Sequence, residues 1–419
     1  MNSELSIFAA RLRDFIDICA TEPSFAARAV EPAVQEYFDI QFNGMALVLF
    51  ALQFNHNPAY RKLCEARKIF PNAIANWKEI PAAPTAAFKE MEFSCLAPAE
   101  RTVVFYSSGT TEQRPSRHFH NAESLALYEA SLQGWFQEHL FGDLKSENLN
   151  FKMDSHFKSE SQNAKSNSDR DFQISDFQFA ILTPPPASAP HSSLVHMFET
   201  VRRNFSVPES AFFGRLDADD SWNLDFAAAT DALRQAVETR RPLVFLGTAF
   251  SFVHLLDHLA EKNFKFELPT GSRVMETGGY KGRSRSLPKA ELHSLITQRL
   301  GIPTDKIACE YGMSELSSQS YDLQISTQNS KLETRNFLFP PWARVQIVSP
   351  ETGREVAEGE TGLLRIFDLA NVFSAMAIQT EDLAVRRGEG FELIGRAELS
   401  EPRGCSLMTG DAKFANCKS

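Results

Sequence analysis

The 419-residue chain contains no apolar run of the length that spans a bilayer, so we expect no transmembrane helix. Its first residues lack the basic start and apolar block of a signal peptide. The six cysteines form no C-x-x-C pair, which argues against a zinc site or a disulfide framework and is typical of reduced cytoplasmic thiols. A net charge of −10 argues against general nucleic-acid binding. We therefore expect a cytoplasmic enzyme or binding protein.

The chain also lacks both common phosphate-binding strings, G-x-x-x-x-G-K-[ST] and G-x-G-x-x-G. What it has instead is a loop rich in hydroxyl side chains, residues 106–117, directly after a predicted strand at 102–105. One glycine among Ser and Thr residues lets such a loop bend tightly and present backbone N–H groups and hydroxyls to an anion. Arg114 and Arg117 would add charge at its rim. A Ser/Thr/Gly segment is more often an ordinary turn, so the loop alone leaves both interpretations open.

Hydrophobic periodicity predicts an α/β protein with a central core and flanking regions. Residues 1–100 are predicted to be mainly helical, whereas residues 101–342 alternate between strands and helices, which is typical of a parallel sheet covered by helices. Within this core, residues from about 145 to 178 are too polar to bury and are predicted to be a surface insertion. Residues 343–394 form a β-rich subdomain, and residues 395–419 a hinge and short C-terminal tail.

Several local features of this core are also predicted. A helix is expected at 122–140, with Asn121 as its N-cap and Ser124 at its third position. Glycines follow two of the predicted strands, where parallel sheets bind ligands at the carboxyl ends of their strands. In the β-rich subdomain we expect strands at 345–348, 362–366, 383–385 and 391–394.

Four short motifs follow one another along the chain. They are Tyr-Ser-Ser-Gly-Thr-Thr at 106–111, Glu-Thr-Gly-Gly at 276–279, Tyr-Gly-Met-Ser-Glu at 311–315, and Thr-Glu-Asp at 380–382 ahead of Gly395-Arg396. Their order and approximate spacing resemble the adenylate-forming superfamily of acyl-CoA synthetases, luciferases and peptide-synthetase adenylation domains. Further segments resemble the LuxE-type acyl-protein synthetases within that superfamily: residues 80–84, 192–195, 275–283 and 403–405.

The resemblance covers roughly residues 75–410, leaving out the polar insertion. It implies the large domain of an adenylate-forming enzyme, with parallel sheets packed with helices plus a β-rich subdomain, and a very short tail in place of the usual small domain. It also implies an acid–thiol ligase, which uses ATP and Mg²⁺ to convert a carboxylic acid, expected to be a fatty acid, into an acyl-adenylate. The acyl group would then pass to a protein cysteine.

Specific roles follow from the resemblance, and the residue chemistry suits them. Tyr311 would lie flat against adenine, and Glu315 would bind Mg²⁺, which neutralises charge on pyrophosphate. Asp382 would accept hydrogen bonds from the ribose hydroxyls, and Arg396 would contact the nucleotide from the hinge. The nucleotide site would comprise Ser107, Ser108, Gly109, Thr110, Thr111, Gly278, Gly279, Tyr311, Gly312, Met313, Ser314, Asp382 and Arg396. Taken singly, Tyr311 could be an ordinary buried aromatic and Asp382 a solvated turn residue.

Two features depart from the superfamily pattern. Glu112 and Ser116 stand where the loop usually has glycine and lysine. Only residues 396–419 follow the hinge, so the usual C-terminal lysine that assists adenylation has no evident counterpart, although Lys413 or Lys418 could reach the site. LuxE-type proteins share such a short tail, which favours that family.

Cys405 is the acyl acceptor that the resemblance implies. Arg403 lies two residues away, and a neighbouring cation favours the nucleophilic thiolate. The other interpretation is a small buried hydrophobic residue, which is the usual environment of a free cysteine. Cys417 is a less favoured acceptor.

Two other functions stay open at this stage. The same adenylation chemistry could deliver the acyl group to coenzyme A or to an acyl-carrier protein, and Cys405 would then be inert. The chain could also be a non-catalytic docking partner of an acyl reductase, although Tyr311, Glu315 and Asp382 argue against that. The expected partners are therefore a carboxylic acid and an acyl reductase or acyl-carrier protein, with no nucleic acid and no membrane span.

Overall fold

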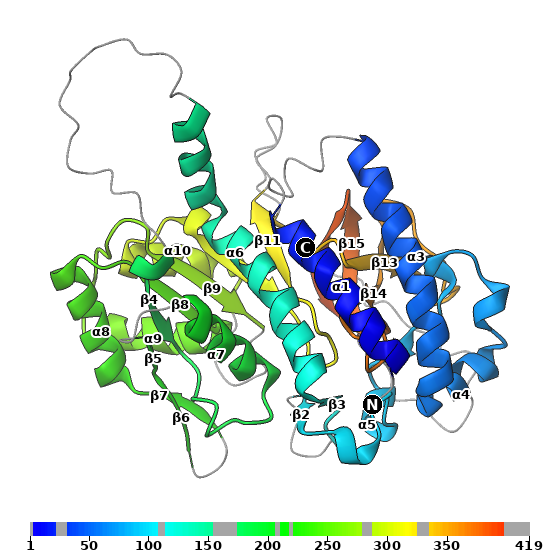
Figure 1. Ribbon diagram of the computed structural model, residues 1–419. Coiled ribbons are helices and arrows are strands. Elements are labelled where there is room, and N and C mark those ends of the chain that lie inside the picture. The colour runs from blue at the N-terminus through cyan, green and yellow to red at the C-terminus, as the bar shows by residue number, and fades with distance from the viewer. Residues whose placement is uncertain are drawn as a thin grey trace. The chain divides into compact units, whose positions relative to one another are not determined.

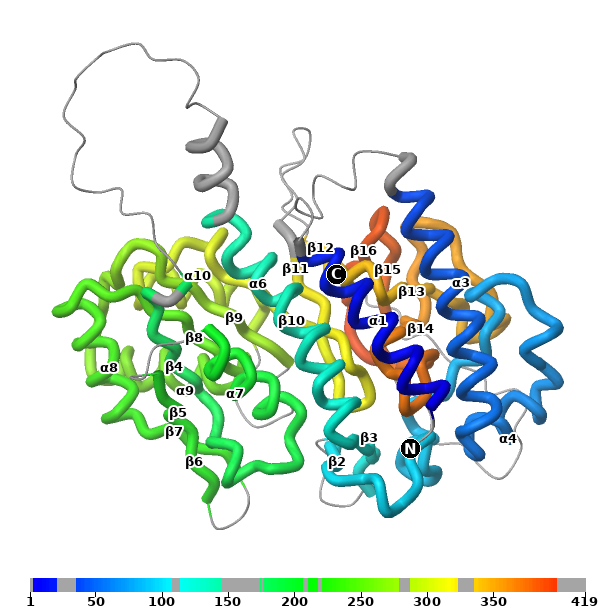
Figure 2. The backbone as a smooth tube through the Cα atoms, viewed as in Figure 1, coloured from blue at the N-terminus to red at the C-terminus, as the bar shows by residue number. Residues whose placement is uncertain are grey.

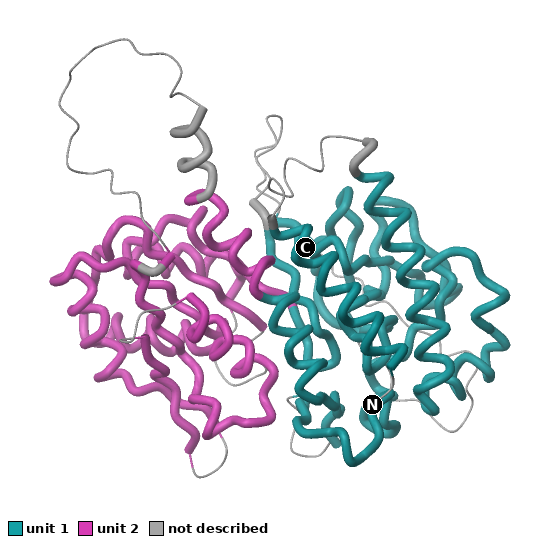
Figure 3. Tube along the Cα trace, viewed as in Figure 1, with its two compact units in different colours: residues 1–132, 312–419 teal, residues 133–311 magenta. Residues whose placement is uncertain are grey.

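The computed structural model describes residues 3–21, 32–107, 114–153, 174–205, 210–217, 221–278, 287–324 and 335–397. The chain forms two compact units (Figure 3). Unit 1 contains residues 1–132 and 312–419, and unit 2 contains residues 133–311. The helical N-terminal region and the β-rich region lie far apart in the sequence, yet both belong to unit 1.

Unit 2 is built on a parallel sheet with the strand order β10–β9–β8–β4–β5 (Figures 1 and 2). Its strands are β4 (Gln178–Ile181), β5 (Ala211–Phe212), β8 (Leu243–Thr248), β9 (Arg273–Thr277) and β10 (Ile307–Tyr311). Strands β4 and β9 are buried along their whole length, which is usual for parallel sheets. The predicted parallel sheet is therefore confirmed.

Helices cover this sheet and complete the core of unit 2. They are α7 (Ser193–Phe205), α8 (Phe226–Thr239), α9 (Ala249–Glu261) and α10 (Lys289–Leu300). Leu233, Phe252 and Ile296 of α8, α9 and α10 pack into one cluster with Phe245 and Val274, which are register partners on neighbouring strands. These three helices therefore lie on the same face of the sheet. A short antiparallel hairpin, β6 (Gly214–Leu216) and β7 (Trp222–Leu224), also belongs to this unit.

Helix α6 (Ala122–Met153) begins where the sequence predicts but ends later. The N–H of Ser124 donates to Asn121 Oδ1 (2.8 Å), and the N–H of Asn121 donates to Ser124 Oγ (2.9 Å), which confirms the predicted cap. The helix continues beyond residue 140, where Asp143 pairs with Arg273 and Lys306, at 2.6 and 2.7 Å. The predicted insertion at about 145–178 therefore starts too early, because residues 145–153 belong to α6, whereas its predicted end agrees with the start of β4 at Gln178. Residues 154–173 lie outside the described residues.

Unit 1 contains a sheet with the strand order β13–β14–β15–β16–β12–β11, which is antiparallel at every pairing described between these strands. A two-residue strand, β1 (Ala83–Pro84), adds in parallel beside β15. The other strands are β11 (Ser320–Gln324), β12 (Arg335–Leu338), β13 (Ala343–Val348), β14 (Thr361–Asp368), β15 (Ala377–Arg387) and β16 (Gly390–Arg396).

The predicted strands of the β-rich region are present, but the sheet is larger than predicted. Strands β11 and β12 precede residue 343 and were not predicted, and β15 begins at Ala377 instead of near residue 383. The run Thr380-Glu381-Asp382 is polar and suggests a turn, yet it lies within β15. The interpretation of Asp382 as a solvated turn residue is therefore wrong.

The N-terminal region is helical, as predicted. Its helices are α1 (Ser3–Thr21), α3 (Pro32–His56) and α4 (Pro58–Arg67), followed by the single turn α5 (Ala87–Glu90). Helix α1 runs beside α3 (Figures 1 and 2). Helix α3 packs on the sheet, because the ring of Phe42 lies 4.8 Å from the Arg344 guanidinium. Single-turn 3₁₀ helices lie at Pro71–Ala73, Trp77–Glu79, Pro98–Glu100, Ile174–Asp176 and Thr304–Lys306.

Candidate active site

The predicted phosphate loop is the connection of an antiparallel hairpin in unit 1, formed by β2 (Val103–Tyr106) and β3 (Arg117–His120). Two bonds between Ser107 and Ser116 close its base. The N–H of Ser107 donates to Ser116 O (3.3 Å), and the N–H of Ser116 donates to Ser107 Oγ (3.0 Å). Arg117 is paired with Glu92 (2.9 Å). The remaining predicted phosphate contacts, Ser108, Gly109, Thr110 and Thr111, lie outside the described residues.

The Tyr-Gly-Met-Ser-Glu motif ends in a buried segment whose backbone is held by two polar side chains. Asn371 Nδ2 donates to Glu315 O (2.8 Å). The carboxylate of Asp368, fully buried, accepts hydrogen bonds from Ser317 N (2.9 Å) and Ser318 N (2.8 Å). These bonds reach main-chain atoms, so they fix the path of the backbone. They do not involve the side-chain carboxylate of Glu315.

Helix α3 contributes to the same framework. Gln53 Nε2 donates to Asn371 O (2.7 Å), and Gln53 Oε1 accepts from Met376 N (3.0 Å). Asn57, which follows α3 and is the N-cap of α4, donates from Nδ2 to Ser374 O (3.1 Å). Both side chains are fully buried, so each bond compensates for a polar group removed from water. The N-terminal helices therefore support the segment that holds Glu315.

Glu315 is only 5% exposed and lies among groups of opposite charge. Burial raises the pKa of this carboxyl group, while the Ser116 hydroxyl and the positive charges of Arg396 and Lys89 oppose that rise. Arg396 and Glu315 were predicted site residues, and the structure brings them together. Lys89, on α5, was not predicted, because a lone lysine on a single helical turn carries no sequence signal.

Asp382 and Arg396 are also brought together. They are register partners on β15 and β16, and Arg396 Nε lies 3.3 Å from Asp382 Oδ1. The register shifts beside Ile394, so that a β-bulge immediately precedes Gly395 and Arg396. A bulge bends a strand and redirects its side chains, which here affects the last strand before the predicted hinge.

Two further predicted residues lie at neighbouring strand ends in unit 2. Gly278 directly follows β9, and Tyr311 is the last residue of the adjacent strand β10. Gly278 has φ of +69°, a conformation that favours glycine. The side chain of Tyr311 is buried at the carboxyl end of β10. The motif continues with Gly312, Met313 and Ser314, which belong to unit 1. Gly279 lies outside the described residues.

Two buried carboxyl groups accompany these strand ends. Burial alone would raise the pKa of Glu276, but a hydrogen bond with His293 (3.3 Å) and the charge of Lys289 outweigh it, and the net pKa lies below its usual range. Glu310 accepts a hydrogen bond from Thr277 Oγ1. Burial raises the pKa of Glu310 to about 7, and the negative charge of Glu276 adds to the rise. Sequence reasoning missed Glu310, because its pKa depends on burial.

Glu310 should make the stability of the protein depend on pH. Between its ordinary pKa of 4.5 and about 7, the folded state holds a proton that the unfolded chain has lost. The free energy of unfolding should therefore fall by about 3 kcal/mol as pH rises through this window. Glu310→Gln should remove that slope, measured as the thermal midpoint between pH 5 and 8. Glu261→Gln, at an exposed end of α9, is the control, and an equal slope in both variants would contradict the prediction.

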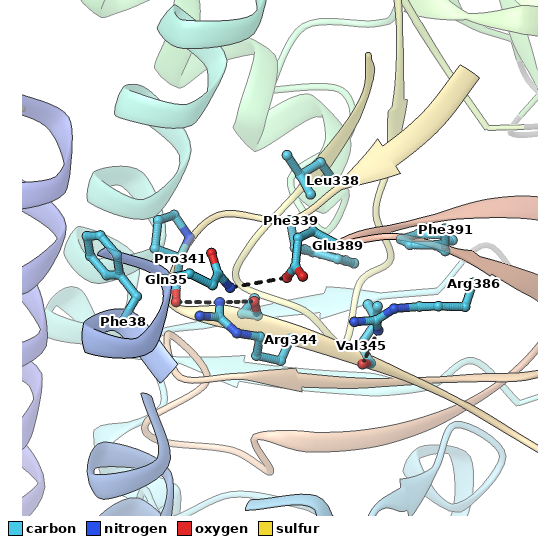
Figure 4. A pocket seen from close by; sticks show the side chains of 11 residues that line it. Gln35, Phe38, Leu338, Phe339, Pro341, Arg344, Val345, Arg386, Glu389 and Phe391 are labelled. Atoms are coloured by element: carbon cyan, nitrogen blue, oxygen red, sulfur yellow. Dashed lines mark hydrogen bonds between the residues drawn. The ribbon is translucent and has the colours of Figure 1, made fainter. Parts of the chain in front are cut away.

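A small cavity in unit 1 lies apart from all these residues. Its volume is about 30 Å³, enough for about one water molecule. It is lined by aromatic residues and by Gln35, Arg344, Arg386 and Glu389, with Gln35 Nε2 donating to Glu389 Oε2 at 3.3 Å (Figure 4). None of the predicted site residues that the structure describes lines it, and at this volume it is too small for a nucleotide. We assign it no part in the site.

The model of the family described as "Acyl-protein synthetase, LuxE" matches residues 115–414. The chain belongs to the LuxE acyl-protein synthetase family. The resemblance inferred from the four motifs is therefore confirmed. The family match includes β3, the Tyr-Gly-Met-Ser-Glu motif, Asp382, Arg396 and Cys405.

Two curated relatives of this LuxE-family chain are long-chain-fatty-acid–luciferin-component ligases. The protein from Aliivibrio fischeri is 24% identical over 48% of this chain, and the one from Vibrio harveyi is 20% identical over 45%. The alignments span about half the length of these relatives, 53% and 50%.

Solved structures confirm the fold of this LuxE-family member. A 2-hydroxyisobutyryl-CoA ligase in complex with 2-HIB-AMP and CoA superimposes with a TM-score of 0.59 at 13% identity, over 88% of this chain and 69% of that one. The same ligase in a postadenylation state with R3-HIB-AMP gives a TM-score of 0.58 at 12% identity, over 85% and 68%. The predicted adenylate-forming fold is thus confirmed. Among the described helices, none has the length and apolarity to cross a membrane.

Proposed function

We propose that this chain is an ATP-dependent, AMP-forming ligase that activates a fatty acid as its adenylate and transfers the acyl group to the thiol of Cys405. The observation that carries this proposal is the arrangement around Glu315. A buried carboxylate is held through its backbone by Asn371, and the cations Arg396 and Lys89 act on it. Such an arrangement suits a site for polyphosphate and metal, because the carboxylate can bind a metal cation and the two cations can attract phosphate.

In the first reaction, a carboxylate oxygen of the acid would attack the α-phosphorus of ATP, and the bond to the β-phosphate oxygen would break to release pyrophosphate. Glu315 would hold Mg²⁺, which supplies charge neutralisation for the phosphates when bound. The described residues contain no group of three or more His, Cys, Asp or Glu side chains that could hold a metal alone. One carboxylate, phosphate oxygens and water are the ligands that Mg²⁺ usually takes in such sites.

In the second reaction, a thiolate would attack the acyl carbon, forming a thioester and releasing AMP, while the thiol proton passes to solvent. The described cysteines suit this step poorly. Burial raises the pKa of both Cys64 and Cys95 to about 12, and Cys19 and Cys309 are buried. The other two, Cys405 and Cys417, lie outside the described residues, and Cys405 has Arg403 nearby in sequence.

The choice of a fatty acid rests on the names of the two curated relatives, which are long-chain-fatty-acid ligases. The same names favour a protein as the acceptor of the acyl group after Cys405. We propose that this protein is an acyl reductase or an acyl-carrier protein. A panel of fatty acids of increasing chain length, with short acids and amino acids as controls, tests the substrate class. Pyrophosphate release reports adenylation, and intact mass reports acylation of the protein. No acid-dependent pyrophosphate release with any fatty acid would overturn the proposal.

The hydroxyl-rich loop gives a separate prediction. Thr110→Val keeps the side-chain volume and deletes a hydroxyl that would donate to phosphate, so KM for ATP should rise about tenfold, as expected for a hydrogen bond to a charged group. Thr110→Ser keeps the hydroxyl and should leave KM for ATP close to that of the wild type. Steady-state pyrophosphate release measures both. A change confined to KM for the acid would show that the loop does not hold phosphate.

A further inference from the structure

His118 joins the hairpin of the phosphate loop to the backbone of the Tyr-Gly-Met-Ser-Glu motif. It lies on β3, two residues after Ser116 closes the loop, and its side chain is 3% exposed. His118 Nδ1 lies 2.8 Å from Ser314 O, the carbonyl directly before Glu315. This contact links residues 196 positions apart in the sequence.

The chemistry of this contact fixes the state of the imidazole ring. A carbonyl oxygen only accepts, so Nδ1 carries the proton and donates it. Burial lowers the pKa of His118 to about 4, so the ring is neutral at physiological pH. The ring packs against that of His120 in a tilted arrangement, with 4.2 Å between ring centres and 50° between ring planes, and His120 is in turn bonded to Ser124 Oγ (3.1 Å). The ring is therefore placed by the hairpin and by the first turn of α6.

The bond from His118 completes a framework that holds the motif at successive peptide groups. His118 binds the carbonyl of Ser314, Asn371 binds the carbonyl of Glu315, and Asp368 binds the N–H groups that follow. Asn371 and Asp368 come from the β14–β15 connection and from β14, whereas His118 comes from the hairpin. Of these three side chains, only His118 belongs to the element that also carries the phosphate loop.

We propose that His118 is a positioning residue for adenylation, which holds the Ser314–Glu315 peptide at a fixed place relative to the base of the phosphate loop. This inference rests on the proposed function. Glu315 would hold the metal and the loop would hold the phosphates of the same ATP molecule, so both must keep a fixed separation for Mg–ATP to bind well. Loss of the His118 bond should therefore weaken the binding of Mg–ATP and leave the binding of the acid unchanged.

The test is the exchange of pyrophosphate into ATP by the full chain, with KM measured separately for Mg–ATP and for the acid. His118→Phe keeps an aromatic ring and removes the donor, and KM for Mg–ATP should rise about tenfold. The Mg²⁺ concentration that gives half-maximal exchange should rise with it. His118→Asn places an amide N–H near the position of Nδ1 and should recover most of the wild-type KM.

The chain offers a matched control in His139. This half-buried histidine, in the part of α6 that belongs to unit 2, also has Nδ1 bonded to a backbone carbonyl, Trp135 O, at 2.9 Å, and burial also lowers its pKa to about 4. His139→Phe should leave both KM values unchanged. If His118→Phe fails to fold, His118→Leu serves the same comparison.

Each result bears on the inference. If the wild type is active and His118→Phe keeps the wild-type KM for Mg–ATP, with only a lower thermal midpoint, His118 is a structural residue. That result would overturn this inference and leave the proposed function standing. An equal rise of KM in His139→Phe, or no recovery in His118→Asn, would also overturn it. A wild-type protein without any exchange would instead overturn the proposed function, together with this inference.

Discussion

Replacing Glu315 with Gln is expected to lower ATP- and acid-dependent pyrophosphate release by a factor of about 10² or more. Gln has nearly the same shape as Glu and carries no charge. The bond from Asn371 reaches the backbone carbonyl of residue 315, so it survives the change. The loss would therefore report the missing carboxylate charge and not a displaced segment.

The Glu315 variant should be compared with a control variant, and its activity should be measured as a function of Mg²⁺ concentration. Glu351→Gln alters an exposed residue in a turn and should leave pyrophosphate release at the wild-type rate. The Glu315 variant should need a higher Mg²⁺ concentration for half-maximal activity, because the proposed metal ligand has lost its charge. Because Glu315 is buried, its neutral replacement should not lower the thermal midpoint. Full activity in this variant would show that the Tyr-Gly-Met-Ser-Glu motif does not bind the metal.

Cys405→Ser is expected to abolish stable, hydroxylamine-labile labelling by radioactive acid, because an alcohol is a far poorer nucleophile than a thiolate at neutral pH. The adenylation half-reaction needs only ATP, Mg²⁺ and the acid, so exchange of pyrophosphate into ATP should survive in the variant. Lost labelling with retained exchange is the combination that the proposed function requires.

The matched variant Cys417→Ser should keep both labelling and exchange. Thioester labelling that persists in Cys405→Ser and disappears in Cys417→Ser would move the acceptor to Cys417. Loss of both labelling and exchange in Cys405→Ser would assign that cysteine a structural role. Formation of acyl-CoA by this variant would favour coenzyme A as the acceptor, and a wild-type protein that binds ATP without releasing pyrophosphate would favour a docking role.

The sequence was sufficient to predict those parts of the fold and site that depend on local pattern. Hydrophobic patterning predicted the strands at 345–348 and 362–366, which are β13 and β14, and the Asn121 cap predicted the start of α6. Motif order placed Glu315 and Arg396 in one predicted site, and the charge of Arg396 acts on the Glu315 carboxyl group although the two are far apart in the chain. The signal of each strand, cap and motif lies in a few adjacent residues.

The rest of the site depends on contacts between distant residues and could not be read from local pattern. Asp368 lies about fifty positions from the serine N–H groups that it binds, and nothing in its neighbours marks it as buried. The first half of β15 is polar, so only its pairing with β14 and β16 makes it a strand. The pKa values of His118 and Glu310 depend on the absence of water around them, which composition does not show.

The way in which the Ser314–Glu315 segment is held also bears on how this family can diversify. His118 and Asn371 bind carbonyl groups, which every amino acid supplies, so they place no requirement on the side chains of the motif. Neighbouring positions such as Met313 can therefore change in evolution or in the laboratory without loss of the backbone path. The requirement for a particular side chain falls instead on His118 and Asn371, which bind those carbonyl groups. A LuxE-family enzyme could thus acquire new selectivity at the motif while its distant supports stay fixed.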